Sequence, residues 1–114
     1  MTPWVLLDSI IIPGETGELR LLQRGNEFSM NIMGQGELMN SRVHASEDAL
    51  AEQTCTRLNN CAHARLLIGG LGMGFTLAAA LRQVGEQAQV LVAEWLPAVV
   101  KWNLGPLGEL TGFP

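Results

Sequence analysis

The chain has 114 residues, of which 47% are hydrophobic and 16% charged, a size and balance that fit one compact globular protein. Its net charge of −4 argues against a nucleic-acid partner, because a nucleic-acid-binding surface is normally basic. No apolar run reaches the roughly 18 to 20 residues of a membrane helix, so no membrane role is expected.

The first part of the chain has the alternation of half-buried strands. Leu19, Leu21 and Gln23 alternate with Glu18, Arg20 and Leu22, and apolar and polar residues alternate again over 28–32, with the turn signal Gly25-Asn26 between the two runs. Pro13-Gly14 marks an earlier turn. The pattern predicts a small antiparallel sheet of three or four strands, which we assign to an N-terminal β-hairpin domain over residues 1–43.

A helix is predicted next, within a connecting segment over residues 44–63. Ser46 is a suitable N-cap, and the acidic pair Glu47-Asp48 follows where the helix dipole favours negative charge. Asn59-Asn60 ends the run. Apolar residues at helical spacing predict the buried face: Leu50, Ala51, Cys55 and Leu58. Cys55 and Cys61 stand six apart, which is not the tight pairing of a zinc site, so we expect reduced thiols, no metal and a cytoplasmic protein.

The remaining segment, residues 64–114, alternates between strand and helix patterns. Strands are predicted at 65–68 and 89–93, and a helix at 75–84 with Leu77, Leu81 and Val84 on one face. A second helix begins at Pro97 and stops at Gly105-Pro106. Such alternation implies parallel strands, so we predict an α/β fold (α+β overall) whose last segment is the first part of an incomplete Rossmann-like domain.

The stretch "LLIGGLGMGF", residues 66–75, places four glycines between the predicted strand and helix: Gly69, Gly70, Gly72 and Gly74. A glycine turn at this place lets a ligand approach the backbone and the helix N-terminus closely. The spacing is G-x-G-x-G, whereas dinucleotide-binding turns have G-x-G-x-x-G. The stretch therefore favours a nucleoside-type ligand without a pyrophosphate; the alternative is a tight turn that binds nothing.

Glu94 closes the second predicted parallel strand and lies 20 residues beyond Gly74. A carboxylate at that place can accept both hydroxyl hydrogens of a ribose, and it would repel the 2′-phosphate of NADP. The alternative is a solvated loop acid. Trp95 could stack on the ligand or serve as a core or dimer contact, and His44 could be structural or catalytic.

These stretches together resemble the spermidine synthase family, whose members place a β-hairpin domain before an S-adenosylmethionine-dependent methyltransferase fold. "GELRLLQRGNEFSMNIMGQGELMNSRVHASEDALAE" resembles the hairpin domain and its connecting helix, "LLIGGLGMGFTLAAAL" the cofactor loop, and "VLVAEWLPAVVKWN" the second strand with its ribose-binding acid. The resemblance implies a cofactor, S-adenosylmethionine or its decarboxylated form. It also implies a set of cofactor-binding residues: Gly69, Gly70, Leu71, Gly72, Gly74, Glu94, Trp95 and Glu37.

The chain departs from the family's pattern at several places. Leu71, Gly72 and Met73 stand where polyamine synthases have a loop acid, and Glu37 lies near the place of a family glutamine. The family's tyrosine-and-histidine motif is not recognisable. The family's catalytic aspartate follows the fourth parallel strand of the domain, whereas the chain has two predicted parallel strands. We therefore name no catalytic residue.

Two functional hypotheses follow. The first is the N-terminal part of an aminopropyl- or methyltransferase, inactive as it stands; the second is a non-catalytic remnant of the cofactor fold or an assembly module. NAD-dependent oxidoreduction conflicts with the glycine spacing. Because one side of the strand at 65–68 would lie open, we also expect a homo-oligomer formed through this sheet edge.

Overall fold

The computed structural model describes residues 2–14, 17–58 and 61–112, so the predicted helix end at Asn59-Asn60 lies outside the described residues. The chain is mixed α/β and divides into two compact units, Met1–Val43 and His44–Pro114, each of which is described by itself. Within the described part of the chain, no helix combines the length and the apolar character that crossing a membrane requires.

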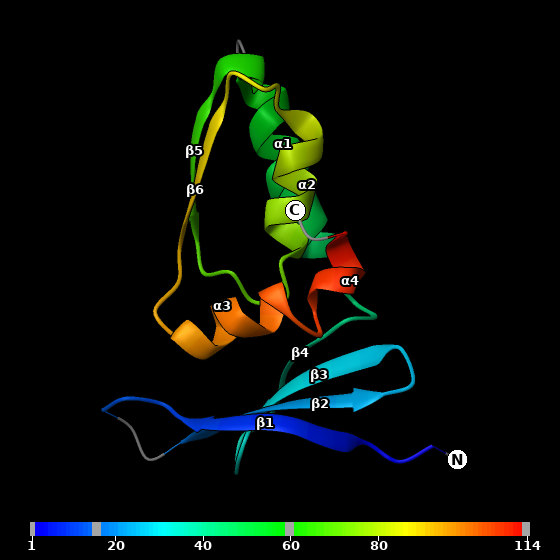
Figure 1. The fold of residues 1–114 in the computed structure, drawn as a ribbon. Coiled ribbons are helices and arrows are strands. Elements are labelled where there is room, and N and C mark those ends of the chain that lie inside the picture. Colours follow the sequence, from blue (N-terminus) through cyan, green and yellow to red (C-terminus); the bar gives the residue numbers. More distant parts are fainter. Residues whose placement is uncertain (1, 15–16, 59–60, 113–114) are drawn as a thin grey trace. The chain divides into compact units, whose positions relative to one another are not determined.

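The first unit is a four-stranded antiparallel sheet with strand order β1-β2-β3-β4 (Figure 1). Gly25, at φ 60°, occupies the tight turn between the second and third strands, where a left-handed backbone suits glycine. The predicted sheet of three or four strands thus has four. Their bounds are β1 Val5–Ile11, β2 Glu18–Arg24, β3 Glu27–Ile32 and β4 Gly36–Asn40.

The two faces of this sheet differ in chemistry, as the sequence alternation predicts. Leu21 pairs with Met30 in the β2–β3 register, and both side chains are fully buried. The neighbouring pair, Leu22 and Ser29, points to the opposite face because successive side chains alternate across a strand. One face is therefore the apolar core of the unit, and the other carries polar and charged groups.

The second unit contains a parallel pair of strands, β5 and β6, with α1 and α2 on one side of it (Figure 1). The predicted strands and helices are present, and a short helix, α4, was not predicted. The bounds are α1 Ala45–Arg57, the 3-10 helix η1 Cys61–His63, β5 Arg65–Gly69, α2 Phe75–Gln83, β6 Gln89–Ala93, α3 Pro97–Leu104 and α4 Gly108–Thr111.

Small side chains form the contact between α1 and α2. Ala51, Ala79 and Ala80 are buried together, and Leu66 and Ile68 of β5 pack against them. Alanine lets two helices approach closely, and larger residues beside the contact are then left outside it.

This close approach corrects the predicted helix faces. Leu50 is 61% exposed, Leu58 is 40% exposed and Leu81 is 39% exposed, so none of these leucines belongs to the buried face. Of the predicted face of α1, Ala51 and Cys55 are buried. The helical period was right, but the alanines and not the leucines lie at the closest approach.

The predicted N-cap of α1 is also wrong. The helix begins at Ala45 with His44 as its N-cap residue, and Ser46 lies in the first turn. The His44 ring lies 2.9 Å (Nδ1) from the Asp48 carboxylate (Oδ2) and stacks on Phe75 with 3.9 Å between ring centroids. This local stack holds the start of α1 against the start of α2, an arrangement that the capping pattern could not reveal.

The core of the first unit gives a stability prediction. Replacing Leu21, which is 0% exposed, with alanine removes buried methyl groups and should lower the free energy of unfolding by about 2–5 kcal/mol. Ile11→Ala is the matched control, because Ile11 is 76% exposed and a surface change of this kind stays within about 0.5 kcal/mol. Urea unfolding followed through amide NMR signals of residues 17–43 would measure both. Equal losses for the two variants would contradict the assigned core.

Candidate functional site

The glycine loop, residues 70–74, joins β5 directly to α2. Gly70, Gly72 and Gly74 have φ values of 85°, 55° and 85°, the left-handed region in which residues with a side chain are strained. Gly74 is the N-cap residue of α2, and its N–H donates to the Leu71 carbonyl at 2.9 Å. The glycines are thus required by the backbone path, whatever the loop binds.

Glu94 lies at the carboxyl end of β6 and binds the glycine loop. Its Oε1 accepts the Leu71 N–H at 2.8 Å and its Oε2 accepts the Leu96 N–H at 3.0 Å. The carboxyl ends of parallel strands share one edge of a sheet, which is where ligands bind in open α/β sheets. The structure therefore brings together Glu94 and the loop that the sequence places far apart.

The carboxylate keeps capacity for a ligand. An ionised carboxylate has about four lone-pair sites, and each Glu94 oxygen uses one of them for a backbone N–H. One site on each oxygen is left, which matches the two neighbouring hydroxyls of a ribose in number. Ideal Cβ atoms at Gly69 and Gly70 would meet nothing within 4 Å, so the backbone beside the carboxylate is open to approach.

Asn103 of α3 fixes the far side of the loop. Its Nδ2 donates to the Gly72 carbonyl at 2.8 Å and to the Val99 carbonyl at 2.9 Å. A Cβ at Gly74 would lie 2.7 Å from Asn103 Oδ1, closer than a Cβ carbon comes to such an atom. Sequence reasoning missed this residue, because a single asparagine inside a helix carries no signal of the loop that it holds.

The other candidate side chains of the second unit have different surroundings. Trp95, next to Glu94, is 64% exposed. His44 sits between Asp48 and Phe75, which gives it a structural role. Burial raises the pKa of the Cys55 thiol to about 11, and a hydrogen bond with Cys61 adds to the rise, so this thiol is a poor nucleophile.

Glu37, the remaining candidate, belongs to β4 of the first unit. Its Oε2 accepts the Ser29 hydroxyl at 2.5 Å and its Oε1 accepts the Asn40 side-chain amide at 2.8 Å. These two hydrogen bonds, with the nearby charge of Arg42, hold the pKa of the Glu37 carboxyl below its ordinary value of 4.5. Glu37 is therefore ionised at neutral pH and fixed by partners from its own sheet.

Each unit contains a cavity. One of about 180 Å³ adjoins Gly69 and Gly70 and is lined mainly by apolar side chains of α1 and β5, without Glu94 or Trp95. Pockets for small molecules usually span roughly 300–1,000 Å³. A whole nucleoside cofactor would therefore lie over the loop surface beside Glu94 and not inside this cavity. The second cavity, of about 570 Å³, lies on the polar face of the first unit beside Glu37.

Comparisons with protein-family models, with curated proteins and with solved structures gave no match. The resemblance to the spermidine synthase family therefore rests on the quoted residues alone.

The contact between the glycine loop and Asn103 gives a second stability prediction. Gly70→Ala and Gly74→Ala place a side chain at the same φ of 85°, and each should cost about 1–2 kcal/mol for the left-handed backbone. Gly74→Ala should cost more, because its Cβ also meets Asn103, whereas Gly70 faces open space. Thermal unfolding of both variants measures the difference. Equal destabilisation would show that Asn103 does not confine the loop.

Proposed function

We propose that the second unit binds a nucleoside cofactor of the S-adenosylmethionine type, either S-adenosylmethionine or its decarboxylated form. In this proposal the chain is the N-terminal, cofactor-binding part of a cytoplasmic transferase of the spermidine synthase-like, Rossmann-like methyltransferase class. The observation that carries the proposal is the hydrogen bond between Glu94 and the Leu71 N–H, because it joins a ribose-accepting carboxylate to an open glycine loop.

Different residues would contact different parts of the cofactor. Glu94 would accept the two ribose hydroxyls on its remaining lone pairs, as a carboxylate at the end of a second parallel strand does. The open backbone at Gly69 and Gly70 would lie against the amino-acid or aminopropyl end. The exposed ring of Trp95 offers a surface on which the adenine could stack.

Bound cofactor would supply a sulfonium electrophile, to which the protein adds mainly position and local charge. No side chain assigned to the cofactor loop can deprotonate an attacking group: the loop residues are glycines, Leu71 and Met73. Glu94 would have its remaining lone pairs on the ribose hydroxyls. In the family this task belongs to an aspartate after a fourth parallel strand. The described residues contain two parallel strands, so we expect binding without transfer from this chain alone.

Calorimetric titration of the purified chain would test the proposal. Heat is expected with S-adenosylmethionine, its decarboxylated form or methylthioadenosine, and none with NAD, whose pyrophosphate suits a different glycine spacing. Heat with NAD alone would favour the oxidoreductase hypothesis. An absence of heat with every ligand would favour the non-catalytic assembly module.

Glu94→Gln sharpens this titration. The neutral amide should weaken cofactor binding by about tenfold to a hundredfold, because hydrogen bonds to a charged group contribute about 1.5–3 kcal/mol. Glu86→Gln is the matched control, since Glu86 is an exposed acid in the same unit. Amide NMR spectra would show that both variants stay folded. Equal affinity of the two folded variants would remove Glu94 from the site.

We also propose that two copies associate through the open edge of β5. The parallel sheet has two described strands, and Leu67 and Leu91, which pair across it, are 74% and 65% exposed. An antiparallel β5–β5 pair centred on Leu67 would place Leu66 opposite Ile68 and Arg65 opposite Gly69. No like charges would face each other, so a second copy fits this edge.

Light scattering after size exclusion tests the association. The wild-type chain should be dimeric, and Leu67→Lys should be monomeric, because two lysines would then face each other across the two-fold axis. Leu104→Lys is the matched control: Leu104 is 73% exposed on α3, away from the strand edge, and the variant should stay dimeric. A monomeric wild-type chain, or dissociation by both variants, would contradict edge pairing.

A further inference from the structure

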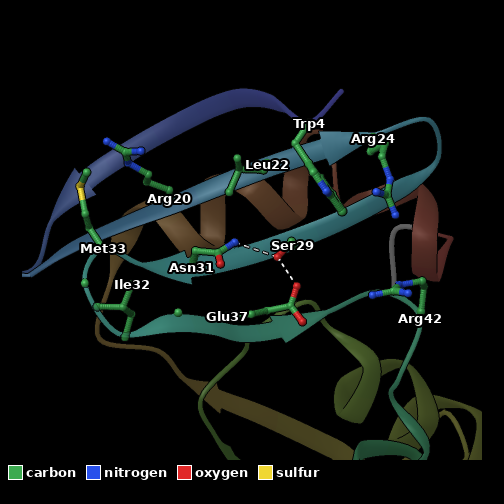
Figure 2. A pocket seen from close by; sticks show the side chains of 12 residues that line it. Trp4, Arg20, Leu22, Arg24, Ser29, Asn31, Ile32, Met33, Glu37 and Arg42 are labelled. Carbon is green, nitrogen blue, oxygen red and sulfur yellow. Dashed lines mark hydrogen bonds between the residues drawn. The ribbon is translucent and has the colours of Figure 1, made fainter. Parts of the chain in front are cut away.

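The first unit contains a cavity of about 570 Å³ over the face of the sheet opposite its apolar core (Figure 2). Arg20, Leu22 and Arg24 of β2 reach this face because they alternate with the buried Leu19 and Leu21. Its size falls in the roughly 300–1,000 Å³ range of small-molecule sites. The glycine loop and Glu94, which carry the proposed function, take no part in it.

A fixed hydrogen-bond network occupies the middle of the cavity. Ser29, only 3% exposed, donates its hydroxyl to Glu37 at 2.5 Å and accepts from Asn31 Nδ2 at 2.8 Å. Asn40 holds the other oxygen of Glu37 at 2.8 Å. Figure 2 shows the Asn31–Ser29–Glu37 chain running across the sheet. A solvated surface carboxylate can take all its hydrogen bonds from water. The buried Ser29 hydroxyl instead fixes the orientation of the Glu37 carboxylate.

Three guanidinium groups line the same cavity. Arg20 contacts Glu18 through Nε at 3.1 Å, and Arg24 contacts Glu27 through Nη2 at 3.0 Å. Arg24 also lies over the Trp4 ring, 4.5 Å from its centroid. A guanidinium has five N–H donors, and each of these ion pairs uses one nitrogen, so further donors are available on the cavity side.

The arginines lie at two ends of the cavity. Arg42 Nε is 3.9 Å from the Glu27 carboxylate that binds Arg24, so Arg24 and Arg42 share one end. Arg20 lies four residues back along β2, about 13 Å away at roughly 3.3 Å per residue. Figure 2 shows Arg20 at one side of the view and Arg24 and Arg42 at the other, with Glu37 between them.

The unused hydrogen-bond donors of the cavity select the ligand class. Three arginines line the cavity, and Glu18 and Glu27 pair with Arg20 and Arg24 from outside the lining, so that with Glu37 three carboxylates balance three guanidinium groups. A polycation would find one carboxylate in the described lining, Glu37, whose two oxygens already accept hydrogen bonds from Ser29 and Asn40. Two anionic groups, one for each end, would meet guanidinium donors in the geometry that suits carboxylates. The central carboxylate would then accept a donor carried between them.

We propose that this face of the first unit binds a small dicarboxylic acid that carries an ammonium or hydroxyl group between its two carboxylates. One carboxylate binds Arg24 and Arg42, the other binds Arg20, and the central donor binds Glu37. The residues that the proposal uses all belong to the first unit.

Amide NMR titration of the full chain tests this site. L-Glutamate supplies the ammonium donor, L-malate the hydroxyl donor and succinate neither, while spermidine is the cationic control. Glutamate or malate should shift amide signals of β2, β3 and β4 and bind about tenfold more tightly than succinate, because a hydrogen bond to a charged group contributes at least 1.5 kcal/mol. Spermidine should cause no shift there.

Variants separate this site from general charge attraction. Arg42→Gln should weaken binding of the diacids by about tenfold or more, and Arg82→Gln, an exposed change on α2 of the other unit, should leave it unchanged. Glu37→Gln should bring glutamate down to the affinity of succinate while succinate itself binds as before. Arg20→Lys keeps the charge but loses the paired donors of the guanidinium group, so it should also weaken diacid binding. This variant serves as the test if Arg42→Gln does not fold.

Three outcomes would overturn the proposal. The first is that no diacid shifts the amide signals of β2–β4, and the second is that spermidine shifts them. The third is that Arg42→Gln and Arg82→Gln weaken diacid binding equally. A Glu37→Gln variant that keeps the full preference for glutamate or malate would remove the central donor contact. None of these results bears on cofactor binding, which is read from Glu94 in the second unit.

Discussion

The close contact of Ala51 with Ala79 and Ala80 is the constraint from which the second unit is built. It brings α1 and α2 together against Leu66 and Ile68 of β5, so the chain has to turn from the end of β5 into α2 within five residues. Three of these five adopt the left-handed backbone, which glycine adopts without the strain that a side chain brings. The glycine loop is therefore first a consequence of helix packing, and its open backbone follows from that.

Glu94 fixes the glycine loop and makes it a candidate binding site. Ordering a glycine-rich loop costs more conformational entropy than ordering other residues, so the loop needs contacts that fix its backbone. Glu94 holds one side through Leu71, and Asn103 holds the other through the Gly72 carbonyl. The same carboxylate that would bind a ribose thus also orders the loop, so its substitution acts on stability and on affinity together. For this reason a folded-state readout has to accompany any binding measurement on Glu94.

The sequence could predict what depends on local period and on glycine chemistry. Alternation over 18–23 and 28–32 was enough to place the two central strands and the buried face of their sheet, with Leu21 and Met30 at its centre. It could not predict which apolar residues of a helix are buried, because that depends on the partner surface. Leu50 follows the helical period as well as Ala51 does, yet only the alanine lies where α2 approaches.

The candidate site divides in the same way. The nearness of Glu94 to the glycine loop follows from the rule that parallel strands end at one edge, so the sequence was sufficient to suggest it. Asn103 and the Ser29–Glu37 network were out of reach, because their contacts join residues that no local pattern relates. Glu37 itself was chosen by resemblance, without any indication that three arginines line the same cavity.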